Sequence, residues 1–245
     1  MKYAYSTLAG AYDALTRDVG YEKRADFLEK LFRHSKNDVH TVLDLACGTG
    51  TMTWLLAQRG YETIGVDNSE EMLCEAMNKT GEGIPPLFLQ QSMPKLDLYG
   101  TVDAAICCLD SLNYLTNSRD VRRTFERLHL FIAPGGVLIF DVNTVEKLAA
   151  LDGQVFLDEN EDTYCVWRTE YQRGLCSYYM DIFRRKPDDS WERDFEEHRQ
   201  RGYTVEELTA WLKEAGFGEI HTYGDGVLRK PKDGEQRIYF TAIRK

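Results

Sequence analysis

The sequence is short of basic residues and of long apolar runs. Thirty Lys and Arg stand against 40 Asp and Glu, which gives a formal net charge of -10 at pH 7. Because a nucleic-acid-binding protein normally carries a basic face that neutralises phosphates, nucleic acid is not expected as a partner. No apolar run approaches the roughly 20 residues that span a bilayer, and the N-terminal segment lacks the apolar core of a signal peptide. We therefore expect no membrane partner and a cytoplasmic location.

The cysteines also lack any pattern of a structural site. They form no CxxC pair, follow no regular spacing and have no neighbouring histidine. The six are Cys47, Cys74, Cys107, Cys108, Cys165 and Cys176. We predict neither a disulfide framework nor a zinc site, and no metal of any kind.

Apolar runs alternate with helical patterns through the first 143 residues. The apolar runs are TVLDLA, TIGVD, LFLQ, VDAAICCL and GGVLIFDV, and helical spacing marks 21–35, 52–58, 70–78 and 119–131. Short apolar strands separated by helices are what a parallel sheet covered on both faces requires. The pattern predicts a doubly wound α/β core, in which Pro134, Gly135 and Gly136 turn the chain into the last of these strands.

The pattern changes after Asn143. Residues 154–201 are rich in aromatic and alternating side chains, as in YCVWRTEYQ and SYYMDIFRR, and turn signals interrupt them. This indicates antiparallel strands inserted in the α/β unit. A helix then follows in TVEELTAWLKEAG, where Thr204 and Glu207 have capping-box spacing and Gly216 fits a C-cap. We predict a core at 1–143, an insertion at 144–202 that covers the substrate, and completion of the core at 203–245.

The segment VLDLACGTGT joins a strand to a helix through a turn that contains Gly48 and Gly50. Glycine permits tight dihedrals and lets a ligand lie against the backbone. A nicotinamide-binding fingerprint would place a third glycine at position 53, where Thr53 stands, and would not require Asp44. The interpretation as a dinucleotide-binding site is therefore weakened. The next strand ends in Asp67, about 20 residues after the glycines, and its carboxylate has the acceptor geometry for two vicinal hydroxyls.

These motifs resemble those of the class I S-adenosylmethionine (SAM)-dependent methyltransferases. The resemblance runs from Tyr12 to the C-terminus and is carried by LDLACGTGT, VDNSEEML, CCLDSLNYL, PGGVLIFDVN and EEHRQRGYTVEEL. The chain is similar to small stand-alone bacterial enzymes related to sugar N,N-dimethyltransferases and glycine N-methyltransferase. The resemblance implies a Rossmann-like, mostly parallel seven-stranded sheet with an inserted antiparallel β subdomain that covers the substrate. It also implies SAM as cofactor, S-adenosylhomocysteine as product and a small-molecule acceptor methylated on nitrogen or oxygen.

The resemblance also implies a set of residues that bind SAM. They are Tyr12, Asp44, Ala46, Gly48, Gly50, Asp67, Asn68, Met72, Ser92, Met93, Cys108 and Leu109. Tyr12 with Asp13 would close over SAM. Ser92 and Met93 stand where many relatives have an acidic residue that bonds adenine, and could instead bond and pack against the base. Arg24 could pair with the SAM carboxylate, although an ordinary surface position is the favoured interpretation.

Candidate catalytic residues lie in two places. The loop CCLDSLNYL follows the fourth strand at the carboxyl edge of the sheet, where α/β proteins bind ligands. It supplies Asp110, Asn113 and Tyr114, and Tyr114 aligns with a catalytic position of the sugar N-methyltransferases. Alternatively, Asn113 caps a turn and Tyr114 packs under the insertion. Further along, Glu196, His198 and Gln200 alternate onto one strand face, as do Trp167, Thr169 and Tyr171 on another. His198 is a candidate base, with a structural role favoured.

The predicted function is therefore SAM-dependent methylation of a small molecule by in-line transfer, in which Tyr114, Asp110 or His198 takes up a proton. The alternative that is not an enzyme is a regulatory module that binds SAM or S-adenosylhomocysteine without catalysis. Methylation of RNA or protein is a further alternative, and the acidic charge counts against RNA. The sequence leaves open whether the protein is a monomer or a dimer.

Overall fold

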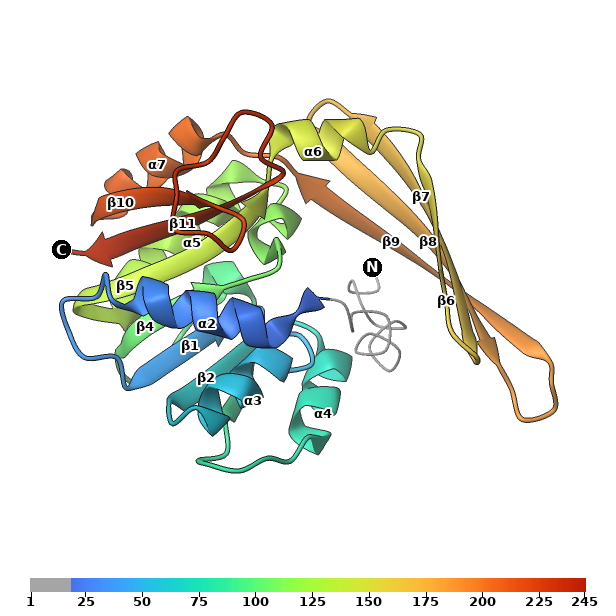
Figure 1. Cartoon of the computed structure of the whole chain (residues 1–245), viewed down its shortest axis with the longest axis horizontal. Helices are drawn as coiled ribbons and strands as arrows, with labels where there is room; N and C mark the ends of the chain where they lie inside the picture. Colours follow the sequence, from blue (N-terminus) through green and yellow to red (C-terminus); the bar gives the residue numbers. More distant parts are fainter. Residues whose placement is uncertain (1–18) are drawn as a thin grey trace.

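The computed structural model describes residues 19–245, which form two separate β-sheets (Figure 1). The larger sheet has seven strands in the order β10-β11-β5-β4-β1-β2-β3. Neighbours from β5 to β3 run parallel, and β11 is antiparallel to both β5 and β10. The strands are β1 (Thr41–Leu45), β2 (Glu62–Asp67), β3 (Leu87–Gln90), β4 (Val102–Cys107), β5 (Ile132–Asn143), β10 (Phe217–Gly224) and β11 (Arg237–Arg244). The predicted Rossmann-like, mostly parallel seven-stranded sheet is confirmed.

Helices cover both faces of this sheet, which explains why its central strands are apolar throughout. Helices α2 (Tyr21–Phe32) and α3 (Thr51–Gln58) contribute to one hydrophobic cluster. Helices α5 (Ser118–Phe131) and α7 (Val205–Glu214) contribute to the other. Helix α4 (Glu70–Asn78) lies beside α3, where the Trp54 indole donates to the Ala76 carbonyl at 2.9 Å. Within residues 19–245, no helix is long and apolar enough to cross a membrane.

Local side-chain and glycine signals fix several helix ends. The Ser69 hydroxyl accepts a hydrogen bond from the Met72 amide at 3.2 Å and caps α4. Thr204 and Glu207 form the predicted capping box at the start of α7, with both reciprocal hydrogen bonds present. Gly216 follows α7 with φ +99°, a left-handed conformation that favours glycine.

The junction between α5 and β5 differs from the prediction. Strand β5 already begins at Ile132, which pairs with Val102, and regular pairing resumes at Val137 opposite Ala104. The Pro-Gly-Gly segment therefore lies in a bulge within the strand and does not precede it. Gly135 adopts φ +82°, which lets the extra residues loop out without breaking the sheet.

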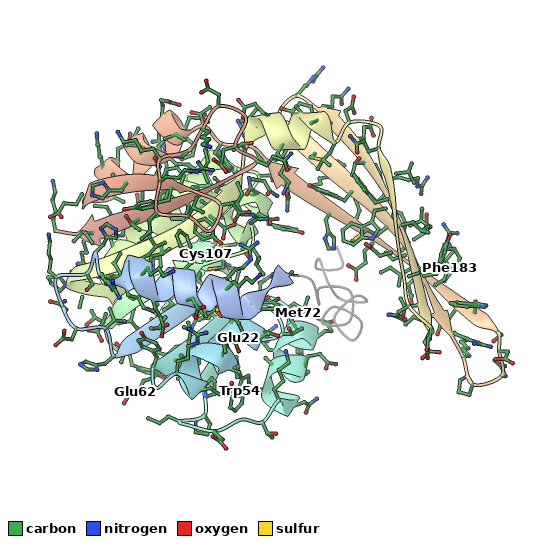
Figure 2. The ribbon with its side chains drawn as sticks, viewed as in Figure 1. Glu22, Trp54, Glu62, Met72, Cys107 and Phe183 are labelled. Atoms are coloured by element: carbon green, nitrogen blue, oxygen red, sulfur yellow. The ribbon has the colours of Figure 1, made fainter. Side chains whose placement is uncertain are left out.

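The second sheet is an antiparallel arm that extends from the core (Figure 1). Helix α6 (Val145–Ala150) leads into it, and its strands are β6 (Val155–Glu159), β7 (Thr163–Gln172), β8 (Leu175–Arg185) and β9 (Trp191–Arg201). Arg173 and Gly174 form the turn between β7 and β8. Phe183 lies far out on the arm, whereas Met72 lies at the edge of the core that faces it (Figure 2). The predicted antiparallel insertion is confirmed.

Candidate active site

A cavity of about 360 Å³ lies at the carboxyl ends of β1, β2 and β4, where the order of the sheet reverses. Its walls come mainly from the loops that follow the first four strands. The lining residues are Tyr21, Asp44, Ala46, Cys47, Gly48, Thr49, Thr51, Met52, Val66, Asp67, Asn68, Ser69, Met72, Gln91, Ser92, Met93, Pro94, Cys108, Leu109, Ser111, Tyr114 and Leu115. All the predicted cofactor residues are among them except Gly50, which lies outside the lining, and Tyr12, which with Asp13 lies outside the described residues.

The turn after β1 is held by backbone contacts to the end of β2. The amides of Ala46 and Cys47 both donate to the Val66 carbonyl, at 2.7 and 3.0 Å. Gly48 has φ +55°, and a Cβ there would meet no atom within 4 Å, so this glycine presents open backbone to the cavity. A Cβ on Gly50 would lie only 2.9 Å from Ala76 and Phe88. Gly50 therefore permits close packing of the turn, and its predicted contact with the cofactor stays a prediction.

Asp67 joins the loops that follow β1 and β2. Its carboxylate accepts the Gly48 amide at 2.8 Å and the Ser69 amide at 2.9 Å. Burial raises the pKa of this carboxyl, and the amides of Ser69 and Gly48 counteract that rise because they stabilise the charged form. The side chain lines the cavity while it fixes both loops.

Asp44 lies deeper in the same wall and is 3% exposed. Burial raises its pKa to about 7, the Thr53 hydroxyl lowers it by donating to the carboxylate at 2.6 Å, and the charge of Asp67 raises it further. Thr53 stands where a dinucleotide fold would have its third glycine, and here it is a buried partner of Asp44. Two carboxyl groups line the cavity, and no Lys, Arg or His is among the described lining residues. This composition favours a positively charged ligand.

The loop after β4 has two consecutive residues in the left-handed region, Leu109 at φ +57° and Asp110 at φ +54°. Such residues cost about 1–3 kcal/mol each. The buried Asp141 carboxylate offsets this cost by accepting both backbone amides, at 2.8 and 3.0 Å. Arg237 then bridges the carboxylates of Asp110, at 2.6 Å, and Asp141. Burial alone would lower the pKa of Arg237, but the charges of Asp141 and Asp110 outweigh it and raise the pKa.

The three candidates in this loop have different surroundings. The Asp110 carboxylate is paired with Arg237, accepts from the Gln200 amide at 2.5 Å and is not among the lining residues. The buried Asn113 bonds the backbone of Asn143 and Arg201 and so ties the loop to β5 and β9. Tyr114, the last residue of the short 3-10 helix η3 (Ser111–Tyr114), lines the cavity.

A hydrogen-bonded row of side chains connects Tyr114 to the arm. The Tyr114 hydroxyl lies 3.3 Å from Nδ1 of His198, and Nε2 of His198 lies 2.8 Å from a carboxylate oxygen of Glu196. His198 is 3% exposed, and Glu196 and Gln200 are buried with it, so the predicted alternation of β9 is confirmed. Of the predicted set on β7, Thr169 bonds backbone carbonyls at Leu151 and Gln154.

The favoured surface interpretation of Arg24 is wrong. Its side chain is 21% exposed and donates to the Tyr239 hydroxyl at 2.6 Å and to the Val19 carbonyl at 3.1 Å. Asp225 lies 3.5 Å away as a third partner. The sequence could not predict this environment, because Tyr239 lies on the last strand of the sheet, far from Arg24 along the chain.

Comparison with known proteins decides the family. The family model described as "Methyltransferase domain" matches residues 42–136. The chain is 34% identical over 241 residues to the putative methyltransferase YqeM of Bacillus subtilis (strain 168). The match covers 97% of this chain and 96% of that protein. The crystal structure of an S-adenosylmethionine-dependent methyltransferase from Clostridium acetobutylicum ATCC 824 is similar, with a TM-score of 0.87, 32% identity and coverage of 98% and 99%. This chain belongs to the SAM-dependent methyltransferases.

The methyltransferase also resembles the glycine/sarcosine N-methyltransferase of Halorhodospira halochloris. The two are 26% identical, and the match covers 81% of this chain and 72% of that protein. The predicted resemblance to this family is confirmed, and SAM is the cofactor. The residues of the cavity fit it: Gly48 presents open backbone, Asp67 presents a carboxylate, and the acidic lining suits a sulfonium cation.

Tyr21 and Ser111 also line the cavity of the methyltransferase, and neither was predicted from the sequence. Tyr21 begins α2, and Ser111 donates from its hydroxyl to the Cys108 carbonyl at 2.8 Å. For Ser111 a signal existed, because it lies between Asp110 and Asn113 in a loop already identified. For Tyr21 none existed, since its distance from the glycine turn in sequence gives no hint of contact.

The raised pKa of Asp44 makes stability depend on pH. The folded carboxyl holds its proton up to about pH 7, whereas the ordinary pKa is 3.8. The folded state therefore binds more protons between these values, and this group's contribution to the free energy of unfolding falls as pH rises from about 4 to about 7. In urea unfolding, the stability of Asp44→Asn relative to wild type should rise by roughly 3 kcal/mol from about pH 5 to about pH 8. A pH-independent difference would contradict this.

Arg237 should be needed for folding because it neutralises the buried carboxylate of Asp141 and the partly buried carboxylate of Asp110. Arg237→Met leaves Asp110 and Asp141 without their cation, and we expect the free energy of unfolding to drop by about 3–5 kcal/mol in denaturant titration. The matched control is Arg185→Met, which removes a solvent-exposed pair with Asp189 and should cost less than about 1 kcal/mol. Equal losses of unfolding free energy in the two variants would show that the bridge between Asp110 and Asp141 contributes no more to stability than an exposed ion pair.

Proposed function

We propose that the methyltransferase transfers the methyl group of SAM to the nitrogen of a small-molecule amine. The observation that carries this proposal is the acidic cavity with Tyr114 in its wall. The Tyr114 hydroxyl contacts His198, so a group able to exchange protons lies next to the ligand space. The N-methyltransferase activity in the name of the Halorhodospira halochloris relative supports nitrogen over oxygen. The match to that relative also supports a small acceptor over a macromolecule.

The lining residues suggest how SAM is held. Asp67 would accept hydrogen bonds from the ribose hydroxyls, and the open backbone at Gly48 would lie against the cofactor. Ser92 and Met93, at the start of the short 3-10 helix η2 (Met93–Lys95), would bond and cover the adenine. The remaining contacts would come from Asp44, Ala46, Asn68, Met72, Cys108 and Leu109, all of which line the cavity.

Bound SAM supplies a methyl group on a positively charged sulfur, which is already an excellent leaving group. The residues of the chain therefore have to align the acceptor and exclude water. Tyr114 marks the acceptor side, because η3 contacts strand β9 of the arm there. Asp110 is committed to Arg237, so we assign proton uptake to Tyr114 and His198 in preference to Asp110.

We further propose that the enzyme works in the cytosol. All six cysteines are unpaired, as expected in a reducing compartment. Cys108, which lines the cavity, is buried, and burial raises the pKa of its thiol well above the ordinary value. This thiol is therefore an inert part of the wall and not a nucleophile.

Release of S-adenosylhomocysteine tests the proposal. Purified enzyme with SAM should release it in the presence of small primary or secondary amines and not with matched alcohols. Tyr114→Phe keeps the ring but removes the hydroxyl, so SAM affinity should stay within about twofold while kcat falls about 100-fold. Tyr99→Phe, at a fully exposed position, is the control and should match wild type. Methylation of alcohols alone, or full activity of Tyr114→Phe, would contradict the proposal.

A further inference from the structure

Three side chains from two distant parts of the chain form a directed hydrogen-bonded row. Tyr114 belongs to η3 in the core, whereas His198 and Glu196 lie two residues apart on β9 and so share one face of the arm. The separations are 3.3 Å between Tyr114 Oη and His198 Nδ1, and 2.8 Å between His198 Nε2 and Glu196 Oε2. Within residues 19–245, the row runs from the cavity to the buried side chain of Glu196 on the arm.

The chemistry of the three groups sets the direction of the row. An ionised carboxylate only accepts hydrogen bonds, so beside an ionised Glu196 the imidazole of His198 would carry its hydrogen on Nε2 and donate it. In the neutral imidazole, Nδ1 then holds a lone pair and accepts the hydrogen of the Tyr114 hydroxyl. The phenolic oxygen can in turn accept a hydrogen bond from a ligand in the cavity. In this tautomer every donor of the two contacts would point away from the cavity and toward Glu196.

We propose that Tyr114, His198 and Glu196 form a proton relay that deprotonates the acceptor ammonium before methyl transfer. This proposal rests on the amine methylation proposed above. One N–H bond of the bound ammonium breaks as its proton passes to the Tyr114 oxygen, and the electron pair stays on nitrogen. The original Tyr114 proton passes to Nδ1 of His198. The neutral amine then has the lone pair needed to attack the methyl carbon, and the imidazolium lies beside the Glu196 carboxylate.

Within this relay, Glu196 is a positioning residue that does not touch the acceptor. It fixes the tautomer of His198 and stabilises the imidazolium in an environment with little water. Other titratable groups also lie near His198 and Glu196. They are Tyr178, the cross-strand neighbour of His198 on β8, Asp110, whose carboxylate bonds Gln200, and the buried thiols Cys165 and Cys176, whose pKa values burial raises. Asp110 is neutralised by Arg237, and burial raises the pKa of Tyr178, so neither replaces Glu196 as the counter-charge.

Glu196→Gln tests the relay, with Glu197→Gln as the matched control. Glu197 is the next residue on the same strand, where it pairs with Arg199 on the opposite, more exposed face. For an amine acceptor at about pH 7, we expect Glu196→Gln to lower kcat about 100-fold without changing SAM affinity, and Glu197→Gln to match wild type. The deficit should shrink as pH rises above the acceptor pKa, because the amine then arrives neutral. Glu196→Asp should recover part of the rate.

Nitrogen-15 NMR of the free protein provides a readout that requires no turnover. Wild-type His198, assigned from its loss in His198→Gln, should carry its proton on Nε2, and Glu196→Gln should shift the population toward the other tautomer. A wild-type proton on Nδ1 would overturn the relay. So would equal kinetics of Glu196→Gln and Glu197→Gln at every pH. If no amine is methylated at all, the proposed function fails by itself, while the NMR result still decides whether Glu196 orients His198.

Discussion

The carboxylate of Asp67 holds two loops of the cavity in place at once. One oxygen accepts the amide of Gly48 in the turn after β1, and the other accepts the amide of Ser69 at the start of α4. Ser69 in turn caps that helix through the amide of Met72, which also lines the cavity. The positions of the glycine turn and of α4 therefore depend on one side chain at the end of β2, and so does the shape of the space between them.

The opposite wall is built on the same principle. Asp141, near the end of β5, accepts the two amides of the left-handed turn after β4, and Arg237 neutralises it together with Asp110. Carboxylates at the carboxyl ends of parallel strands thus hold the loop backbones on both sides. The carboxyl groups of Asp44 and Asp67 have no basic residue beside them among the described lining residues. A cationic cofactor and a cationic acceptor would both be stabilised there.

The sequence was sufficient to predict the fold because its signals are local. Apolar runs and helical spacing predicted the alternation of strands and helices along the core, and the capping box at Thr204 and Glu207 predicted the start of α7. The resemblance placed most of the cofactor residues around one cavity, because they follow successive strands that end at the same edge. Gly50 is not among the lining residues. The sequence could not predict this, because a glycine needed for packing and a glycine that contacts a ligand look alike in a short turn.

Contacts between distant segments could not be predicted in this way. The Asp110–Arg237 pair spans 127 residues and the Tyr114–His198 contact 84. Alternation on β9 predicted that Glu196 and His198 share a face, but not that this face meets η3. Arg24 was misassigned for the same reason, since its partner Tyr239 lies on the last strand. The predicted roles of the lining residues stay predictions, as do the domain boundaries.

The central claim is that Asp67 organises the SAM site, and calorimetric titration of Asp67→Ala with SAM tests it most directly. We predict that the variant remains folded, as judged by urea unfolding. Its affinity for SAM should fall at least about 100-fold, because it lacks the carboxylate that we propose accepts two charge-assisted hydrogen bonds from the ribose. Glu62→Ala, at the exposed opposite end of the same strand, should bind SAM like wild type. Wild-type affinity in a folded Asp67→Ala protein would contradict the account.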